Sequence, residues 1–339
     1  MASLQAVLPE IAKHATERDI DAHWPAEELA QLVTIGAMKW VLELSPLELH
    51  ERYEQIAAAS LAVALIFTQR DSAVQLVDQS PDFARREELL KRFAANELWA
   101  TIGIAQLTTS RQGAEPALLA TETADGFDLH GVIPWCTGAD VADFIIAGAA
   151  MADGRQILFA LPKGLPGVTI DPPMPLVALR STRTTQVRLD HARLDRSLIL
   201  RGPTERVLAS RKKGVPFGQV FLALGLCQAA VDLIQQHTSD AGRRAYDAFE
   251  QELKTRRERV RFLSSPQGEP QAAAVAPQAR ADVGDLAIRV TNAAVTLYKG
   301  SALLATHPAQ RLAREAMFLL VWSCPGPVID CTLDRLIEC

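Results

Sequence analysis

The sequence predicts an α+β protein in which a central group of strands lies between two groups of helices. Apolar residues recur every three or four positions before residue 98 and again after residue 203, which is the period of an amphipathic helix. Between these limits the pattern changes to short apolar runs separated by turn residues, which is typical of strands. With 339 residues, 48% of them hydrophobic, the chain can bury a large core around these elements.

The first region, residues 1–98, is expected to be a helical domain. ELAQLVTIGAMKWVLEL at 28–44 and DFARREELLKRFAANEL at 82–98 repeat apolar residues at helical spacing, with charges on the opposite face. The most apolar run, AAASLAVALIF at 57–67, is much shorter than the roughly 20 residues that a membrane span needs. This run therefore predicts a buried helix.

The second region, residues 99–203, is expected to be a compact β-barrel domain. Segments such as GFDLHGVIPW, ADFIIAGAA and TTQVRLDHARL have the apolar pattern of strands, and turn residues separate them. A series of short strands joined by local turns favours a barrel or a sandwich.

The third region, residues 204–339, returns to the helical period. Four amphipathic segments predict a helical bundle, and the last of them, RLAREAMFLLVW, ends shortly before Pro325. Between the second and third helices, SSPQGEPQAAAVAPQARA at 264–281 is rich in Pro, Gln and Ala and has little to bury. We expect this segment to be an exposed, flexible connection.

Charge and cysteine content exclude several classes of function. The formal net charge is −5 and the sequence has no long run of Lys or Arg, so it lacks the attraction to polyanions that nucleic-acid binding needs. The five cysteines are scattered without a CxxC pair, which favours reduced thiols in a cytoplasm and argues against a zinc cluster. The N-terminus does not resemble a signal peptide. We therefore expect a cytoplasmic protein without a metal site, a membrane span or a nucleic-acid partner.

Four segments resemble motifs of the acyl-CoA dehydrogenase superfamily, in the same order. GVIPWCTGADVAD at 131–143 is similar to its Gly-x-x-x-Trp-x-Thr-x-Ala-x-x-Ala-Asp signature, and LTTS at 107–110 is similar to its Leu/Val-Thr-Glu-Pro strand end. LRSTRTTQVRLDHARL at 179–194 resembles its Arg-x-Ser-x-Thr-x-x-Val segment. LYKGSALLATHPAQRLARE at 297–315 resembles its Gly-Gly-x-Gly segment and the Pro-x-x-Arg-x-x-Arg-Asp that follows. Together the matches cover almost the whole chain.

The resemblance implies a flavoprotein with an N-terminal helical domain, a central β domain and a C-terminal four-helix bundle, assembled as a homodimer or homotetramer. FAD would lie between the β domain and the bundle, with part of its site supplied by a neighbouring subunit. The residues that the resemblance assigns to the cofactor are Leu107, Thr108, Ser110, Trp135, Thr137, Gly300 and Ser301. Those that it assigns to the substrate are Arg180, Ser181 and Thr182.

The residue types in the signature suit a flavin by themselves. The indole of Trp135 offers a flat, rigid, apolar face to an isoalloxazine ring, and the hydroxyl of Thr137 or Thr108 can hydrogen-bond its polar edge. Such hydrogen bonds tune the affinity of the ring for electrons.

The resemblance also indicates where a catalytic base should stand, and this chain has no acid there. In the commonest branch of the family a Glu follows the last Arg of the Arg-x-x-Arg motif by nine residues, and the count from Arg314 reaches Ser323. A second branch carries its Glu near the start of the first bundle helix, close to residues 215–216, where no acid occurs. Glu315 is expected to form a structural ion pair, and His307 to cap a helix.

Three functions fit these observations. The favoured one is an acyl-CoA dehydrogenase-like oxidoreductase that binds FAD, with an electron-transfer flavoprotein as a partner. The second is a two-component monooxygenase that receives reduced flavin, FMN or FAD, from a separate reductase. The third is a homologue that binds flavin or acyl groups without turnover. No motif distinguishes an acyl from an aromatic substrate.

Overall fold

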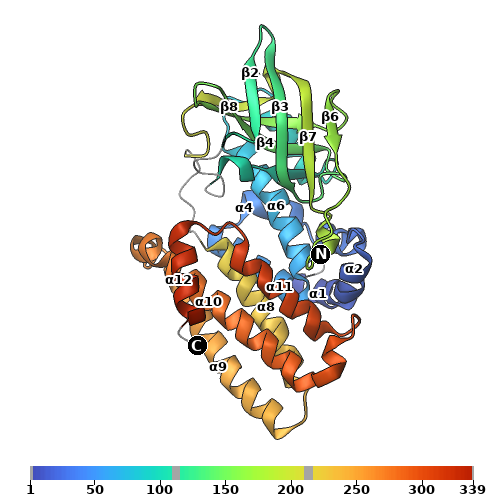
Figure 1. Cartoon of the computed structure of the whole chain (residues 1–339), viewed down its shortest axis with the longest axis vertical. Coiled ribbons are helices and arrows are strands. Elements are labelled where there is room, and N and C mark those ends of the chain that lie inside the picture. Colours follow the sequence, from blue (N-terminus) through green and yellow to red (C-terminus); the bar gives the residue numbers. More distant parts are fainter. Residues whose placement is uncertain (1–2, 109–114, 210–216, 338–339) are drawn as a thin grey trace.

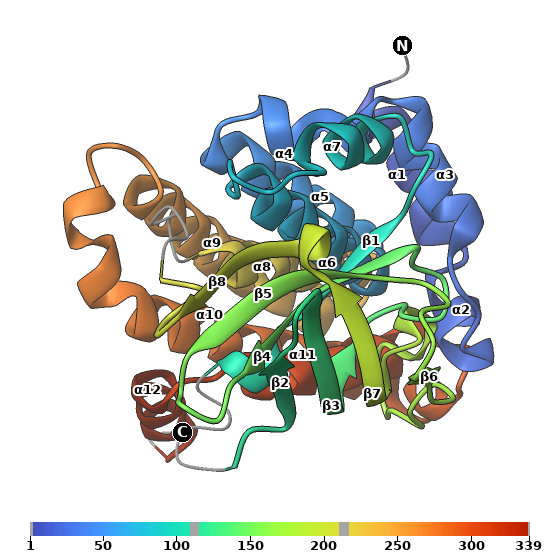
Figure 2. The ribbon, with the colours of Figure 1, turned by 90° about the horizontal axis from the view of Figure 1, so that it is seen from above.

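The computed structural model of the chain describes residues 3–108, 115–209 and 217–337, and it confirms the α+β class. A curved sheet occupies one end of the molecule and most of the helices occupy the other, with α6 (Leu61–Asp78) between them (Figure 1). α12 (Gly326–Ile337) and the N-terminal helices α1 (Leu4–Lys13) and α2 (Ala15–Asp21) lie on opposite sides of the molecule in both views (Figure 2).

The N-terminal region forms helices that pack around α6. The others in this region are α3 (Ala26–Thr34), α4 (Trp40–Glu43), α5 (Pro46–Ala59) and α7 (Arg86–Ala94). α5 begins with a capping box, in which the Ser45 hydroxyl accepts from the Glu48 amide and the Glu48 carboxylate accepts from the Ser45 amide at 3.0 Å. The Ser60 hydroxyl caps α6, so the apolar run at 57–67 is divided between two helices and is almost entirely buried.

The central region forms one eight-stranded sheet with the path β6-β7-β3-β2-β4-β5-β8, and β1 pairs in parallel with β4. The strands are β1 (Ala100–Gly103), β2 (Leu118–Glu122), β3 (Gly126–Cys136), β4 (Phe144–Ala150), β5 (Gln156–Pro162), β6 (Val168–Ile170), β7 (Thr185–Asp195) and β8 (Ile199–Thr204). The barrel that the sequence predicts takes the form of this curved sheet, whose path begins at β6 and ends at β8.

Two hydrophobic cores lie on the two faces of the sheet, and β4 belongs to both because alternate residues of a strand point to opposite faces. Phe144 and Ile146 pack into the core shared with the helices, whereas Ile145 and Ala147 pack into a second core inside the curved sheet. This explains why β4 is apolar along its length. The first core contains helices from both ends of the chain, so the domain boundaries at residues 98 and 203 stay a prediction.

The last region contains a bundle of four long helices, α8 (Gly218–Gln235), α9 (Asp240–Leu263), α10 (Glu269–Tyr298) and α11 (Pro308–Val321). By length and composition α8 could cross a membrane, yet 67% of it is buried inside the protein. It contacts α5, α9, α10 and α11. Its apolar character on all faces therefore follows from its central position in the bundle.

The structure differs from the sequence prediction at residues 264–281. A turn occupies only residues 264–268, and α10 runs without interruption from Glu269, so the prediction of a connection is wrong beyond the turn. Pro270 lies in the first turn of the helix, where a proline removes no hydrogen bond. The alanines that made the segment look unstructured are strong helix formers.

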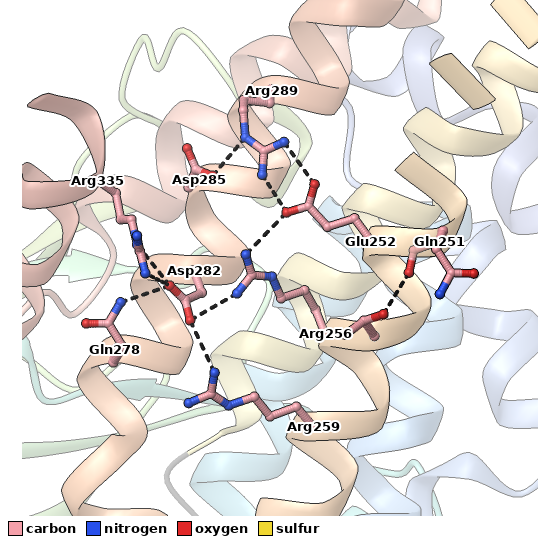
Figure 3. Close-up of polar contacts among 10 residues, drawn as sticks. Gln251, Glu252, Arg256, Arg259, Gln278, Asp282, Asp285, Arg289 and Arg335 are labelled. Carbon is pink, nitrogen blue, oxygen red and sulfur yellow. Dashed lines mark hydrogen bonds and ion pairs between the residues drawn. The ribbon is translucent and has the colours of Figure 1, made fainter. Parts of the chain in front are cut away.

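A further helix that the sequence analysis does not predict, α12, is joined to the bundle by the buried carboxylate of Asp282 on α10. Arg335 of α12 lies 2.9 Å from Asp282 Oδ1, and Arg256 of α9 lies 3.1 Å from Oδ2 (Figure 3). Arg259 and Gln278 contact the same carboxylate. Asp282 therefore connects three helices, and through α12 it stabilises the segment that follows α11.

Candidate functional site

The segment that matches the family signature spans the end of β3 and the turns after it. Packing or hydrogen bonding explains why most of its motif residues have the side chains they have. Gly131 has φ +128°, and a Cβ there would lie 2.3 Å from the Ala117 carbonyl oxygen, so a side chain would collide. Asp143 Oδ2 accepts from the Trp99 amide at 2.7 Å. The two alanines of the motif are buried. The tryptophan and the threonine of the motif are the members that packing does not explain.

Trp135 faces solvent because a β-bulge interrupts β3. Between the pairs that Ile133 and Cys136 form with β7, two residues of β3 oppose one residue of β7. Ile133 and Cys136 therefore both lie in the core inside the sheet, and Trp135 turns outward with 53% of its surface exposed. In an unbulged strand Trp135 would share a face with Ile133. Bulges commonly re-aim side chains beside active sites.

An open depression of about 440 Å³ lies against β7 near this bulge. It is lined by the proline-rich segment 171–175 and by Gln186, the residue of β7 opposite the bulge. Arg188 and Asp171 form a charged wall, with Arg188 Nε 2.9 Å from Asp171 Oδ1. The strand pair that carries the exposed indole therefore also borders a surface concavity.

Thr137 ends a chain of threonine hydroxyls. Thr182 Oγ1 donates to the Leu179 carbonyl at 2.8 Å, and Thr184 Oγ1 lies 2.8 Å from Thr182 Oγ1 and 3.3 Å from Thr137 Oγ1. Because the Thr182 proton is used on a carbonyl, Thr184 donates to Thr182, which leaves Thr137 as the donor of the last contact. A contact of 3.3 Å is weak, so the Thr137 hydroxyl can donate to a ligand instead.

Leu107 and Thr108, the described residues of the LTTS segment, follow β1, and Leu107 contacts β4. Leu107 ends the 3-10 turn η2 (Ala105–Leu107), and its side chain occupies the space over Gly148, where a Cβ would lie 2.2 Å from Leu107 Cδ1. The Thr108 hydroxyl donates to the Ala105 carbonyl at 2.8 Å. Ser110 lies outside the described residues. The cofactor role of these residues stays a prediction.

The 3-10 turn η4 (Arg180–Thr182) is attached to α2. The Arg180 amide donates to Asp19 Oδ1 at 3.2 Å, and the Arg180 guanidinium donates to the Ile20 carbonyl at 2.7 Å. The other two residues of the turn, Ser181 and Thr182, are buried. Arg314 of α11 donates to Asp19 Oδ2 at 2.7 Å, so this carboxylate joins η4 to α11. The substrate role of the turn stays a prediction.

Ser323 follows the end of α11 in a left-handed backbone conformation, with φ 45°, and its residue is exposed. Arg280 of α10 donates to the Ser323 carbonyl at 2.7 Å and also to the Trp322 carbonyl. These carbonyls end a helix and carry a negative partial charge, which a guanidinium stabilises. The backbone at this position is therefore fixed by Arg280 and not by the serine side chain.

Glu315 forms the structural ion pair that the sequence predicts. Arg311 Nη1 lies 2.9 Å from Glu315 Oε1 and 3.0 Å from Oε2, and both side chains are buried. Burial raises the pKa of the Glu315 carboxyl above its ordinary value, and the charge of Arg311 opposes this shift. Since both oxygens accept from Arg311, Glu315 is unsuited to act as a base.

Residues 300–301 lie at the other end of α11 from Ser323, in the turn η6 (Lys299–Leu303), where the Ser301 hydroxyl donates to the Tyr298 carbonyl at 2.5 Å. His307 caps α11 through Nδ1, which accepts from the Ala309 amide at 3.1 Å, and this confirms the predicted cap. α11 has 14 residues and separates its two ends by about 20 Å. One chain therefore does not bring Gly300 and Ser301 together with Ser323.

Over most of its length the chain is similar to acyl-CoA dehydrogenases. No family model matches the chain. Over 97% of its length the chain is 20% identical to the probable acyl-CoA dehydrogenase FadE25 of Mycobacterium tuberculosis, of which the match covers 91%. It is 23% identical to cyclohex-1-ene-1-carbonyl-CoA dehydrogenase of Geobacter metallireducens, over 93% of this chain and 90% of that protein. A shorter match, over 43% of this chain and 39% of the relative, is 27% identical to isobutylamine N-hydroxylase of Streptomyces viridifaciens.

Among solved structures, butyryl-CoA dehydrogenase of Megasphaera elsdenii superposes with a TM-score of 0.82 at 19% identity, over 99% of both chains. The chain has the acyl-CoA dehydrogenase fold. A glutaryl-CoA dehydrogenase of Mycobacterium smegmatis in complex with FADH2 gives 0.78 at 18% identity, over 99% of this chain and 95% of that one. Nitrososynthase of Micromonospora carbonacea gives 0.76 at 22% identity, over 99% and 94%. The resemblance found in the sequence motifs is thus confirmed.

Within this acyl-CoA dehydrogenase fold, His50 is a titratable residue with an altered pKa that the sequence analysis misses. It lies on α5 beside the first turn of α8, with Nε2 3.3 Å from where a Cβ of Gly218 would be and its ring 5.3 Å from that of Phe221. Its Nδ1 is buried and has no hydrogen-bond partner among the described residues. Burial lowers the pKa of His50 to about 4. A lone histidine in a helical segment carries no motif, so nothing in the sequence marks it.

Proposed function

We propose that the protein is a flavin-dependent oxidoreductase of the acyl-CoA dehydrogenase type. The observation that carries the proposal is the pair formed by Trp135, which a bulge turns outward, and Thr137, whose hydroxyl ends a donor chain. A flat apolar face and a nearby hydroxyl donor match an isoalloxazine ring and its polar edge. A bound flavin would supply an acceptor for an electron pair, which side chains do not provide. The structural neighbour that holds FADH2 supports this choice.

We assign FAD as the flavin, with Gly300 and Ser301 contacting the cofactor of a neighbouring subunit. These residues lie about 20 Å from the far end of α11 and are exposed, so they are free to face another chain. The adenosine diphosphate part of FAD extends well beyond the ring and can reach a second subunit, whereas FMN lacks this part. The assignment implies a homodimer or a homotetramer.

The substrate we propose is an acyl thioester or a related compound, with an electron-transfer flavoprotein as the partner that receives the electrons. Oxidation of a thioester at its α and β carbons requires a base that removes the α-proton. The hydroxyl of Ser323 is not a base at neutral pH, and Glu315 is bound to Arg311. A group other than residue 323 must therefore accept the proton.

The serine at position 323 also favours a second candidate, a monooxygenase that receives reduced flavin from a separate reductase. Oxygenation of a substrate does not require a carboxylate that removes an α-proton. The similarity to isobutylamine N-hydroxylase and to nitrososynthase supports this alternative. A homologue that binds flavin without turnover is the third outcome.

The test begins with the visible absorption spectrum of the purified protein. We expect bound flavin, and we expect Trp135→Ala and Thr137→Val to weaken its retention at least tenfold. Leu119→Ala is the matched control, because Leu119 is an exposed apolar residue of β2 on the same sheet. Equal flavin binding by Trp135→Ala and the unchanged protein would refute the assignment of the site.

A panel of acyl-CoA thioesters, added without oxygen, then separates the candidates. Bleaching of the flavin spectrum by a thioester supports the dehydrogenase. Substrate-dependent oxygen consumption with a flavin reductase, and no bleaching, supports the monooxygenase. Flavin binding with neither response leaves the homologue without turnover and overturns both enzymatic proposals.

A further inference from the structure

Three side chains with metal-binding atoms converge on the outer face of the sheet. A second bulge places them, because His130 of β3 opposes both Asp190 and His191 of β7 between two regular pairs. One nitrogen or oxygen atom from each residue lies within 4.8 Å of the others. The two imidazole rings stack with centroids 4.9 Å apart.

The backbone holds this arrangement without help from the three side chains. His191 has φ 52°, a left-handed conformation that the bulge imposes on it. The Asp190 amide donates to the Gly167 carbonyl at 2.8 Å. Gly167 has φ +83°, and a Cβ there would lie 2.7 Å from the Asp190 carbonyl oxygen. The turn before β6 therefore fixes the bulge by close backbone contact.

The distances suit a small tetrahedral ion. Bonds of about 2.0–2.2 Å to nitrogen and oxygen place neighbouring ligand atoms of a tetrahedral site about 3.4 Å apart. His130 Nδ1 and Asp190 Oδ1 lie 3.5 Å apart, close to that value. The longer separations to His191 can close by side-chain rotation, since the three side chains are 59%, 84% and 71% exposed.

A fourth residue orients one ligand. His191 Nδ1 lies 3.0 Å from Asp128 Oδ1, and this carboxylate is mostly buried. A carboxylate that accepts from Nδ1–H fixes the tautomer in which Nε2 carries the lone pair. Histidine ligands of metals usually have such a partner.

We propose that His130, Asp190 and His191 bind one divalent transition-metal ion of the zinc class, with water completing the coordination. Two imidazoles and one carboxylate are the donor set that Zn²⁺, Co²⁺, Ni²⁺ and Cu²⁺ prefer, whereas Mg²⁺ and Ca²⁺ prefer oxygen ligands alone. The sequence analysis expected no metal site, because it considered only the cysteines and the bulge cannot be seen in the sequence.

This site is independent of the proposed flavin site. His130 precedes Trp135 by five residues of β3, a separation of about 16 Å along a strand. An ion at this distance would not touch a ring bound at Trp135. Its expected effect is to join β3 and β7 at the bulge, which stabilises the outer part of the sheet.

The test is calorimetric titration of the full chain with Zn²⁺ after treatment with a chelator. We expect one ion per chain, at least tenfold weaker binding in His130→Ala and in His191→Asn, and about 10-fold to 100-fold weaker binding in Asp128→Asn. Asn replaces His191 because it tolerates the left-handed conformation. His14→Asn is the control, since His14 pairs with Glu17 between α1 and α2 and the variant should bind zinc unchanged.

A measurement on the unchanged protein keeps the proposal testable if a variant does not fold. Co²⁺ at this site should give the intense visible absorption bands of a tetrahedral ion, and Zn²⁺ should displace them. Failure of Zn²⁺ to bind, or binding that is equally strong in His130→Ala and His191→Asn, would overturn the proposal. Equal affinity for Mg²⁺ would overturn the assignment to the zinc class.

Discussion

Acidification is expected to destabilise the protein through His50, and the size of the effect follows from the surroundings of its ring. The imidazole lies between α5 and the first turn of α8, next to the rings of Tyr53 and Phe221. Its Nδ1 is buried and has no hydrogen-bond partner in the part of the chain that the structure describes. Burial therefore disfavours the charged form and lowers the pKa of His50 to about 4.

The sign follows from the proton counts of the two states. In the unfolded chain the pKa returns to about 6.5, so the unfolded state binds a proton between pH 6.5 and pH 4 that the folded state does not bind. The free energy of unfolding consequently falls as the pH falls through this window. The loss amounts to about 2 kcal/mol between pH 7 and pH 5, and because the ring keeps some contact with solvent this is an upper limit.

Urea unfolding of the unchanged protein and of His50→Phe, measured at pH 7, 6 and 5, tests this value. Phe keeps an aromatic ring beside Phe221 but does not titrate. The difference between the two proteins removes the contribution of groups that shift in the opposite direction, such as Glu315 and Asp71, whose raised pKa favours the folded state in acid. Two stability curves that remain parallel over this range would show that His50 is not a neutral buried group.

Three further predictions concern the bundle, the signature and the missing base. Asp282→Ala should lower the free energy of unfolding by about 2 kcal/mol and expose α12 to protease, because three arginines lose their common partner. Asp240→Ala is the control, because the exposed ion pair of Asp240 contributes less than about 0.5 kcal/mol. Gly131→Ala should cost about 3 kcal/mol in urea unfolding through its collision with a backbone carbonyl, against about 1 kcal/mol for Gly154→Ala, whose surroundings are open. Equal losses for the members of either pair would contradict these structural reasons. Ser323→Glu should increase the rate at which an acyl-CoA thioester bleaches the flavin, and an unchanged rate would count against the dehydrogenase.

The order of the elements can be predicted from the sequence because each element reports its own surroundings. Helical periodicity marks α3, α7 and α11, and the uniformly apolar β4 marks a strand between two cores. The start of α10 and the whole of α12 escape this method. Pro325 and Pro327 indicate the end of one helix, yet a proline in the first turn is also how the next helix begins.

The candidate site could likewise be predicted only in part from the sequence. The positions of Trp135 and Thr137 follow from a motif of fixed spacing, so the sequence reveals them. The outward turn of Trp135 and the meeting of His130 with His191 depend on bulges, which are set by the register of β3 against β7 about 60 residues later. A shift of the register by one residue would move these side chains to the opposite face of the sheet, and the composition of the two strands does not indicate which register forms.

The activity of Ser323→Glu can be interpreted because the backbone conformation at residue 323 does not depend on the side chain. Arg280 of α10 donates to the carbonyls of residues 322 and 323, and Asp282, two residues further along the same helix, binds Arg335 of α12. Neither contact involves the side chain of residue 323. A glutamate there would therefore have the same Cα position and the same left-handed backbone strain as the serine. It would also lie near the Arg280 cation, which favours the ionised carboxylate that a base requires. A lack of activity in Ser323→Glu would then reflect the rest of the site and not a misplaced helix end.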